Sequence, residues 1–414
     1  MKLPGPALST APGADARPAA LRTLLALAVV FVMLTTTGWT AVHRPEGGTP
    51  LRAAALSAWS QARIGGRPVP PADASARTVA RFFDGLDGAQ RARLADGYPL
   101  VVGNLDGVPA ATRYRANRLG LEQAGLVEAA RGRDVALAPA DRLTATRRAH
   151  RFASLAEPGR QILAFDPTGG GLVAEVFGDL DRARRVSVVV PGVDTDAITF
   201  ERTQRRFTAP VGMAESLYGA QRAAAPDSRT AVIAWAGYSA PAGVGVDAAT
   251  GRMAFEGAVR LKSLTTALPG DSTVALFCHS YGSVVCGVAA HELPRRVTDV
   301  VVAGSPGMRA SNVAGLRASA RIWATRDEGD WIADVPHLEF GGLGHGADPV
   351  SAEFGARLLS SAMARTHTGY FEPGTDSVDN FAKIGTGAFG SVVCATGDDA
   401  CRDGISGAET AGRA

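Results

Sequence analysis

Five short apolar runs follow one another along the second half of the chain, and longer stretches of mixed polarity separate them. The runs are VSVVV (186–190), TAVIAWA (230–236), TVALFC (273–278), DVVVA (299–303) and RIWAT (321–325). Strands that lack polar alternation are buried on both faces, and their alternation with helix-length segments is typical of a parallel sheet. The pattern therefore predicts an α/β fold with a mostly parallel sheet and helices on both faces.

Two further patterns precede these runs. The stretch RQILAFDPTGGGLVAEVFGD (160–179) places a Pro/Gly turn between two apolar runs, which predicts a β-hairpin. Residues 43–150 are rich in Arg and Ala and carry apolar residues at helical spacing, as in LRAAALSAWSQARI, which predicts a helical N-terminal region. We expect the α/β domain to cover 151–390 and a flexible tail to follow over 391–414.

An uncharged run of about twenty residues, Thr23–Val42, is long enough to span the hydrocarbon core of a membrane. Positive charges precede it, and Trp39 suits a membrane interface. We expect an uncleaved transmembrane signal anchor over 23–42, a disordered cytoplasmic tail over 1–22, and a catalytic domain outside the cytoplasm. A cleaved signal peptide, which would give a secreted protein, and a buried helix are the alternatives.

Charge and cysteine content bear on which partners, metals and disulfides the chain can have. The 414 residues include 43 Lys plus Arg and 40 Asp plus Glu, so no overall field favours a nucleic-acid partner. No CxxC or Cys/His cluster suggests a metal. Cys394 and Cys401 flank a short loop and are either a disulfide or two free thiols. Cys278 and Cys286 lie in apolar runs, where we expect small buried side chains.

Ser280 follows the run TVALFCH directly, and the next segment, YGSVVCGVAAHEL, has the composition of a helix. A tight turn between a strand and a helix lifts a serine oxygen above the carboxyl edge of a sheet, as a nucleophile requires. Gly282 supplies the small residue that such a turn needs two positions after the serine, whereas Cys278 replaces the usual glycine two positions before it. We expect Ser280 to be a catalytic nucleophile.

A nucleophilic serine needs donors for the oxyanion that forms during acyl transfer. In this kind of turn one donor is the N–H of the residue after the nucleophile, here Tyr281. The second comes from a loop after an earlier central strand, and PGVDTD (191–196) follows VSVVV. Gly192 and Val193 are therefore the candidate second donors, although PG also marks an ordinary turn.

The acid and the base are expected after the serine in chain order. Asp330, in GDWI, occupies the preferred loop after RIWAT, and we expect it to be the acid. His367 is the preferred base, because a late loop can return an imidazole to the serine. His345 remains the alternative base. His279, next to the nucleophile, is expected to pack or hydrogen-bond locally.

One motif points to a different class of protein. KIGTGAFGSVV (383–393) matches the glycine-rich loop of protein kinases at every fixed position. A kinase also needs a lysine on the next strand and later H-R-D and D-F-G motifs, and none of these follows. We therefore expect no ATP binding, and interpret this stretch as the exit from the last helix of the domain.

Several stretches in order resemble an actinobacterial α/β-hydrolase family that was formerly catalogued as a domain of unknown function. The resemblance extends from about Tyr98 to Gly387 and rests on YPLVVGNLDGVPAATRYRANR, GDLDRARRVSVVVPGVDTD, AVIAWAGYSAP, CHSYGS, VVAGSPG, GDWI and THTGYFEPGTDSVDNFAKIGTG. It implies an α/β-hydrolase fold with Ser280 as nucleophile, Asp330 as acid and His367 as base.

The predicted function is a serine hydrolase that cleaves a carboxylic ester or related acyl bond through a Ser-His-Asp triad and an acyl-enzyme, without a cofactor. A small-molecule or lipid-like acyl substrate is expected, but the residues do not specify which bond is cleaved. The alternative is an inactive, membrane-anchored binding protein of the cell envelope on the same scaffold, because a fold does not prove activity.

Overall fold

The computed structural model describes residues 49–395 and 399–405, which belong to one compact unit. The predicted membrane anchor, residues 23–42, lies outside this described part. Within the described part, no helix combines the length and the apolar character that crossing a membrane requires.

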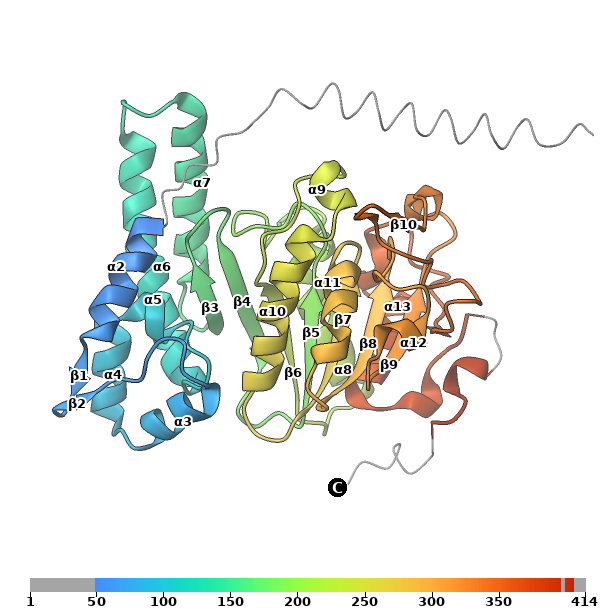
Figure 1. Ribbon diagram of the computed structural model, residues 1–414, viewed down its shortest axis with the longest axis horizontal. Coiled ribbons are helices and arrows are strands. Elements are labelled where there is room, and N and C mark those ends of the chain that lie inside the picture. Colours follow the sequence, from blue (N-terminus) through green and yellow to red (C-terminus); the bar gives the residue numbers. More distant parts are fainter. Residues whose placement is uncertain (1–48, 396–398, 406–414) are drawn as a thin grey trace, which may run out of the picture. The chain divides into compact units, whose positions relative to one another are not determined.

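An eight-stranded sheet forms the centre of the protein (Figure 1). Its strand order is β12-β9-β8-β7-β5-β6-β4-β3, and only β4 runs antiparallel to its neighbours. All five predicted apolar runs are strands, and the predicted hairpin is β3–β4. The bounds are β3 Ile162–Asp166, β4 Leu172–Gly178, β5 Arg185–Val190, β6 Thr230–Ala236, β7 Thr273–His279, β8 Val297–Ala303, β9 Arg321–Thr325 and β12 Arg357–Leu358.

Helices cover both faces of the sheet, as predicted. On one face α10 (Arg252–Ala267) and α11 (Gly282–Ala289) pack on inward residues such as Val188 and Leu276. On the other face α8 (Pro210–Ala224) and α13 (Asp376–Thr386) pack on Val189 and Phe277. Alternate residues of one strand thus serve two separate cores, which is why these strands are apolar throughout. Shorter helices are α9 Val246–Ala249, α12 Val313–Leu316, η1 Arg206–Thr208, η2 Ala290–Glu292, η3 Trp331–Asp334, η4 Gly369–Phe371, η5 Phe389–Ser391 and η6 Ala400–Arg402.

The N-terminal region is helical, as predicted, and has a core of its own that includes Trp59, Val79 and Phe83. Its long helices α6 and α7 form an antiparallel hairpin, and α6 also packs against β3. The bounds are α2 Thr49–Ser60, α3 Ala76–Asp84, α4 Gly88–Gly97, α5 Pro99–Val102, α6 Ala110–Arg133 and α7 Pro139–Leu155. Two two-stranded hairpins complete the structure, β1 Arg63–Ile64 with β2 Arg67–Pro68, and β10 Glu339–Phe340 with β11 Leu343–Gly344.

Side chains of the N-terminal region cover the outer edge of β3. Arg113 Nε donates to the carbonyl of Leu163 at 2.9 Å, and Asn117 Nδ2 donates to that of Ile162 at 2.9 Å. Asn104 pairs with both main-chain groups of Phe165, at 2.7 and 3.0 Å. Polar side chains thus replace the neighbouring strand that an edge strand lacks.

The C-terminal stretch covers the opposite edge. Leu359, directly after β12, forms an antiparallel bridge with Cys394, and a disulfide joins Cys394 to Cys401. Both cysteines are buried in the core beneath α8 and α13. We expected a flexible tail from residue 391, but its described part packs against the sheet, because this bridge and the buried disulfide hold it there.

Two glycines of the kinase-like stretch lie at the end of helix α13. Gly387 adopts the left-handed conformation (φ 83°) at the C-cap of α13, and its N–H donates to the carbonyl of Ile384. Gly385 lies inside α13 where it approaches Gln221 too closely for a side chain. Both glycines therefore have structural reasons in the helix and its termination.

Candidate active site

Ser280 stands on a strained turn between β7 and α11. Its backbone is left-handed (φ 53°), a conformation that is costly for a residue with a side chain. Its N–H donates to the carbonyl of Ala303, which fixes the turn. A Cβ on Gly282 would overlap with the carbonyl oxygen of Val190, so only glycine fits there. The predicted strand-turn-helix arrangement is present, and it places the serine oxygen at the carboxyl edge of the sheet.

Cys278 and Cys286 are not the independent buried thiols that we expected, because they form a disulfide. Cys278 is the next-to-last residue of β7, and Cys286 lies in α11, so the bond joins the two elements that flank the serine. At position 278 such a turn usually has a glycine, which lets the strand and the helix pack closely. Here the side chain at this position is instead bonded to the helix. The disulfide closes a loop that contains Ser280.

Ser280, His367 and Asp330 form one continuous chain of hydrogen bonds. The Ser280 hydroxyl lies 2.8 Å from Nε2 of His367, and Nδ1 of the same ring lies 2.8 Å from Oδ1 of Asp330. All three residues are buried. The order of contacts, hydroxyl to imidazole to carboxylate, is the order that lets a histidine accept a serine proton.

Asp330 is held by more than the imidazole. The hydroxyl of Tyr370 donates to Oδ2 at 2.6 Å, and the N–H of Ile332 donates to Oδ1 at 2.9 Å. Burial alone would raise the pKa of Asp330, but the hydrogen bonds from His367 and Tyr370 outweigh it and lower that pKa. The carboxylate therefore stays ionised and able to orient His367. Tyr370 is not among the site residues that the sequence predicts.

A second histidine supports the main chain of the first. His279 donates from Nε2 to the carbonyl of His367 at 2.6 Å, and the two rings are 5.0 Å apart. Burial, and then the proximity of His367, lower the pKa of His279 to about 4. His279 is therefore neutral above this range, and it packs locally as the sequence suggested.

The candidate oxyanion loop lies against the nucleophile. A Cβ on Gly192 would stand 2.7 Å from Cβ of Ser280, so the loop backbone approaches the serine as closely as a glycine allows. The hydroxyl of Tyr238 donates to the carbonyl of Pro191 at 2.6 Å and holds the loop in place. Within the described residues the N–H groups of Gly192, Val193 and Tyr281 have no protein acceptor, so all three predicted donors remain available to a substrate oxygen.

His345, the alternative base, takes no part in the chain of hydrogen bonds. Its Nε2 pairs with the carbonyl of Ala248 at 2.7 Å, and its ring packs edge-on against Tyr281 at 5.6 Å. Burial lowers the pKa of His345.

The ring of Trp331 lies 4.8 Å from that of His367, and Trp331 is 46% exposed. Trp331 therefore forms part of the open wall beside the imidazole.

Comparison with known families agrees with this geometry. Residues 166–340 match a family model described as alpha/beta hydrolase. The chain has the α/β-hydrolase fold. The matched residues include β4 to β9, Ser280 and Asp330, and the resemblance predicted from the sequence is confirmed.

The curated relatives of this chain are distant. Two uncharacterized proteins of Mycobacterium tuberculosis, from strains CDC 1551 and H37Rv, are each 25% identical over 383 residues. The match covers 77% of this chain and 57% of each relative, so the chain spans a little over half of their length.

Solved structures are also similar to this chain. A predicted CIB-like hydrolase from Thermoplasma acidophilum shares 13% identity (54% of this chain, 94% of that chain, TM-score 0.34). Est1E from Butyrivibrio proteoclasticus shares 12% (54% and 97%, TM-score 0.32).

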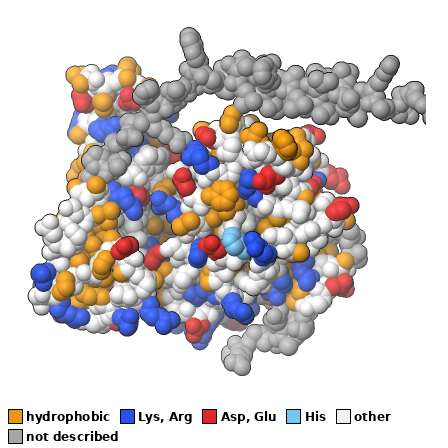
Figure 2. Space-filling model, in the orientation of Figure 1, with side chains coloured by type: hydrophobic (Ala, Val, Ile, Leu, Met, Phe, Trp, Pro, Cys, Tyr) orange, Lys and Arg blue, Asp and Glu red, His pale blue; other side chains and the backbone are white. Residues whose placement is uncertain are grey.

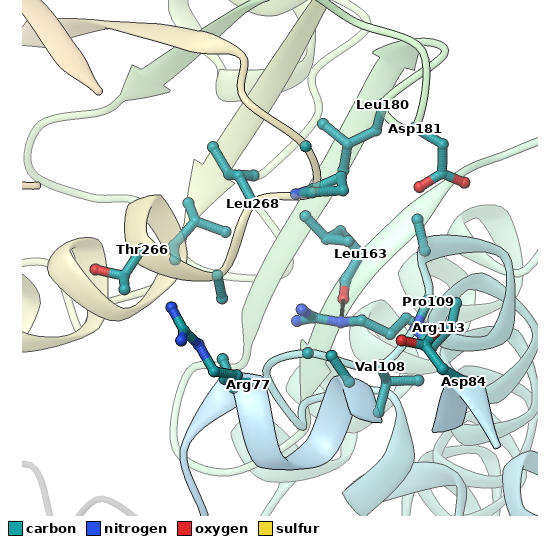
Figure 3. A pocket seen from close by; sticks show the side chains of 18 residues that line it. Arg77, Asp84, Val108, Pro109, Arg113, Leu163, Leu180, Asp181, Thr266 and Leu268 are labelled. Atoms are coloured by element: carbon teal, nitrogen blue, oxygen red, sulfur yellow. Dashed lines mark hydrogen bonds between the residues drawn. The ribbon is translucent and has the colours of Figure 1, made fainter. Parts of the chain in front are cut away.

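A cavity of about 500 Å³ lies away from this site (Figure 3). Leu268 and Gly270, just before β7, and Leu180, before β5, line it, which places it at the amino edge of the sheet. Arg113 points into the drawn cluster, but its guanidinium is bound to main-chain carbonyls and to Asp106. The cavity contains no triad residue.

No cluster of potential metal ligands occurs within residues 49–395 and 399–405.

Proposed function

We propose that this α/β-hydrolase is a serine hydrolase that cleaves a carboxylic ester or related acyl bond. One observation carries the proposal: Ser280, His367 and Asp330 are linked by hydrogen bonds of 2.8 Å on a strained turn at the carboxyl edge of the sheet. Surface serines and histidines seldom combine a left-handed backbone, burial and this order of contacts.

In the first step His367 Nε2 accepts the proton of Ser280 as the serine oxygen attacks the acyl carbon. Asp330 keeps the Nδ1–H of His367 directed away from the serine and stabilises the imidazolium that forms. The N–H groups of Val193 and Tyr281 donate to the developing oxyanion. The imidazolium then protonates the leaving alcohol, and an acyl-serine remains.

Water completes the reaction by the same route. His367 accepts a proton from the water that attacks the acyl-serine, and it returns the proton to the Ser280 oxygen as the carboxylic acid leaves. Tyr370 and His279 act as positioning residues, because one binds the carboxylate of Asp330 and the other binds the main chain of His367.

Reaction with a fluorophosphonate probe tests the proposal. Such a probe should label the wild-type protein and leave Ser280→Ala unlabelled, and hydrolysis of acyl esters of graded chain length should fall by about 10⁴-fold or more in the variant. Correctly folded wild-type protein that takes up no probe would instead favour an inactive binding protein on this scaffold.

We propose that residues 23–42 anchor the protein in the cell membrane as a single span. The described domain then lies outside the cytoplasm. The uncharged run and the two disulfides support it, since disulfides persist in oxidising compartments. Protease added to intact cells should then cleave the domain. A secreted protein, released after cleavage near residue 42, would be found in the medium.

A further inference from the structure

Large apolar side chains are exposed unevenly on the two edges of the sheet. Nine of the sixteen that are exposed among the described residues lie on three segments at the carboxyl edge: the α6–α7 tip, the loop through α9, and the segment from η3 to the loop before His367. We call this set the apolar rim: Val135, Leu143, Val244, Val246, Trp331, Leu338, Phe340, Leu343 and Met363, which are 46–89% exposed. No large apolar residue is exposed in the described amino-edge loops 179–184, 225–229, 268–272 and 317–320.

The hairpin of α6 and α7 projects past the carboxyl edge. Arg148 donates to the carbonyl of Gly169, just after β3, so this residue marks the level of the sheet edge. Helix α7 begins nine residues earlier, at Pro139, which places its start about 14 Å beyond that level. Val135, at the tip, is 89% exposed.

The other two segments form one connected surface. Thr250, after α9, bridges to Leu343 of the β10–β11 hairpin, and Arg309 forms an ion pair with Glu339 of the same hairpin. Phe340 is 83% exposed at the hairpin turn. Trp331 continues this surface to the ring of His367, so the rim reaches the mouth of the active site.

The views agree with this arrangement. The α6–α7 tip, α9 and β10 lie along the upper side of Figure 1, and Figure 2 shows apolar side chains at the hairpin tip and around α9. Arginine and lysine side chains follow the lower edge in Figure 2. A set of exposed apolar side chains like the apolar rim, gathered on one side of a domain, indicates an interaction surface.

The described N-terminus lies at the same edge of the sheet as the apolar rim. Arg52, in the first turn of α2, pairs with Asp166 at the carboxyl end of β3, so the described chain begins at the same edge. Residues 43–48 separate this helix from the uncharged run that ends at Val42. A run that can insert into lipid is thus tied, through a short connection, to the edge that carries the apolar rim.

We propose that the apolar rim docks on the surface of a lipid bilayer. Docking then turns the mouth beside Trp331 toward the lipid, and the substrates are acyl esters presented by a lipid layer. The substrate class rests on the proposed hydrolase function, whereas docking itself does not. Charges near the α6–α7 tip balance, with Asp134 and Asp141 beside Arg133 and Arg142. Zwitterionic lipid therefore suffices, since apolar contact supplies the attraction.

A fluorophore at the rim tests the docking without any catalysis. All four cysteines are in disulfides, so a maleimide dye attaches only to a new thiol. Full-length Phe340→Cys and Val259→Cys proteins, both in the Ser280→Ala background, are labelled and mixed with phosphatidylcholine vesicles that carry nitroxide on the acyl chains. Val259 is the matched control, because it is 68% exposed but lies midway along α10.

We expect the nitroxide lipid to quench the dye at position 340 and to leave the dye at 259 unaffected. Equal quenching at the two positions, or none at 340, overturns the docking proposal. Emission at 340 that is already blue-shifted without vesicles also overturns it, because residues 23–42 or a second copy would then cover the rim.

Activity tests the substrate class separately. Phe340→Ser in otherwise wild-type protein should lower hydrolysis of an ester carried in vesicles by about tenfold, the effect of losing one buried aromatic contact. It should leave hydrolysis of a short soluble ester unchanged, and Val259→Ser should change neither rate. Equal loss on both substrates contradicts the proposed substrate class. Absence of all hydrolysis refutes the hydrolase while the quenching result still stands.

Discussion

Tyr370 donates a 2.6 Å hydrogen bond to Oδ2 of Asp330, and this is one of two side-chain hydrogen bonds that lower the pKa of the buried carboxylate. The same hydroxyl accepts the N–H of Asp327 at 3.0 Å. The phenol therefore fixes both the charge and the position of the acid that orients His367.

Removal of this hydroxyl should slow the proposed reaction. Tyr370→Phe loses a hydrogen bond to a charged group, worth about 1.5–3 kcal/mol, so we expect kcat to fall about 10- to 100-fold with little change in KM. The pKa of Asp330 should rise because one group that lowers it is lost. Steady-state kinetics across pH on a soluble ester measure both effects. Tyr218→Phe, on α8, is the control, and a wild-type rate in Tyr370→Phe would contradict the positioning role.

A methyl group at position 192 should block the site. The new Cβ would stand 2.7 Å from Cβ of Ser280, so either the oxyanion loop or the serine must move. We expect Gly192→Ala to lower kcat by about 100-fold or more, the loss typical of a missing oxyanion donor.

Thermal unfolding separates this effect from misfolding. Gly192→Ala should keep a cooperative transition, and Gly219→Ala, on α8, provides the control because nothing lies within 4 Å of its added Cβ. Full activity in Gly192→Ala would place the oxyanion loop elsewhere.

His279 should make the fold sensitive to acid. Its pKa is about 4 in the folded protein and about 6.5 in an unfolded chain, so between these values only the unfolded state binds the extra proton. The contribution of neutral His279 to the stability of the fold is complete above pH 6.5 and is lost as the pH falls toward 4. Between pH 7 and pH 5 the free energy of unfolding should drop by about 2 kcal/mol from this residue.

Denaturant unfolding of His279→Gln at the two pH values checks this. The variant keeps a donor for the carbonyl of His367 but cannot titrate, so its loss between pH 7 and pH 5 should be smaller than that of the wild type. The exposed His291→Gln is the matched control. An unchanged pH dependence in His279→Gln would show that His279 does not titrate as inferred.

The two disulfides should differ in their effect on activity. Removal of Cys278–Cys286 by a double alanine variant should lower the free energy of unfolding by about 2–3 kcal/mol, as expected for a short closed loop. It should also lower kcat, because the loop contains Ser280. The double variant of Cys394 and Cys401 should lose stability but keep kcat, since that disulfide lies at the sheet edge. Equal kcat in both variants would mean that the first disulfide does not support the serine.

Much of the fold was predictable because its signals are local. The apolar runs of β5 to β9 are continuous in sequence, and a parallel sheet fixes the edge at which the loops after them meet. Loop positions after these strands therefore predict Ser280, Asp330 and His367 as site residues, and the structure brings these three together. His345, the alternative base, also lies in a plausible loop, but in the structure its Nε2 pairs with the carbonyl of Ala248, whereas His367 bonds Ser280 and Asp330.

The features that sequence reasoning missed depend on contacts between distant elements. Cys278 and Cys286 each have the apolar neighbours of an ordinary buried thiol, and nothing local shows that strand and helix bring them together. The role of Tyr370 depends on a loop returning to Asp330 across 40 residues. The tail after residue 391 is polar and rich in glycine, so the burial of its described part follows only from the bridge at β12.

The covered edges of the sheet have a consequence for association. An exposed edge strand offers unpaired main-chain groups on which another chain can add a strand, and this is a common start of aggregation and of strand exchange between subunits. Here Asn104, Arg113 and Asn117 occupy one edge and the segment around Cys394 occupies the other. Two copies of this chain should therefore not join by extending the sheet, and loss of the Asn117 amide should favour such β-aggregates.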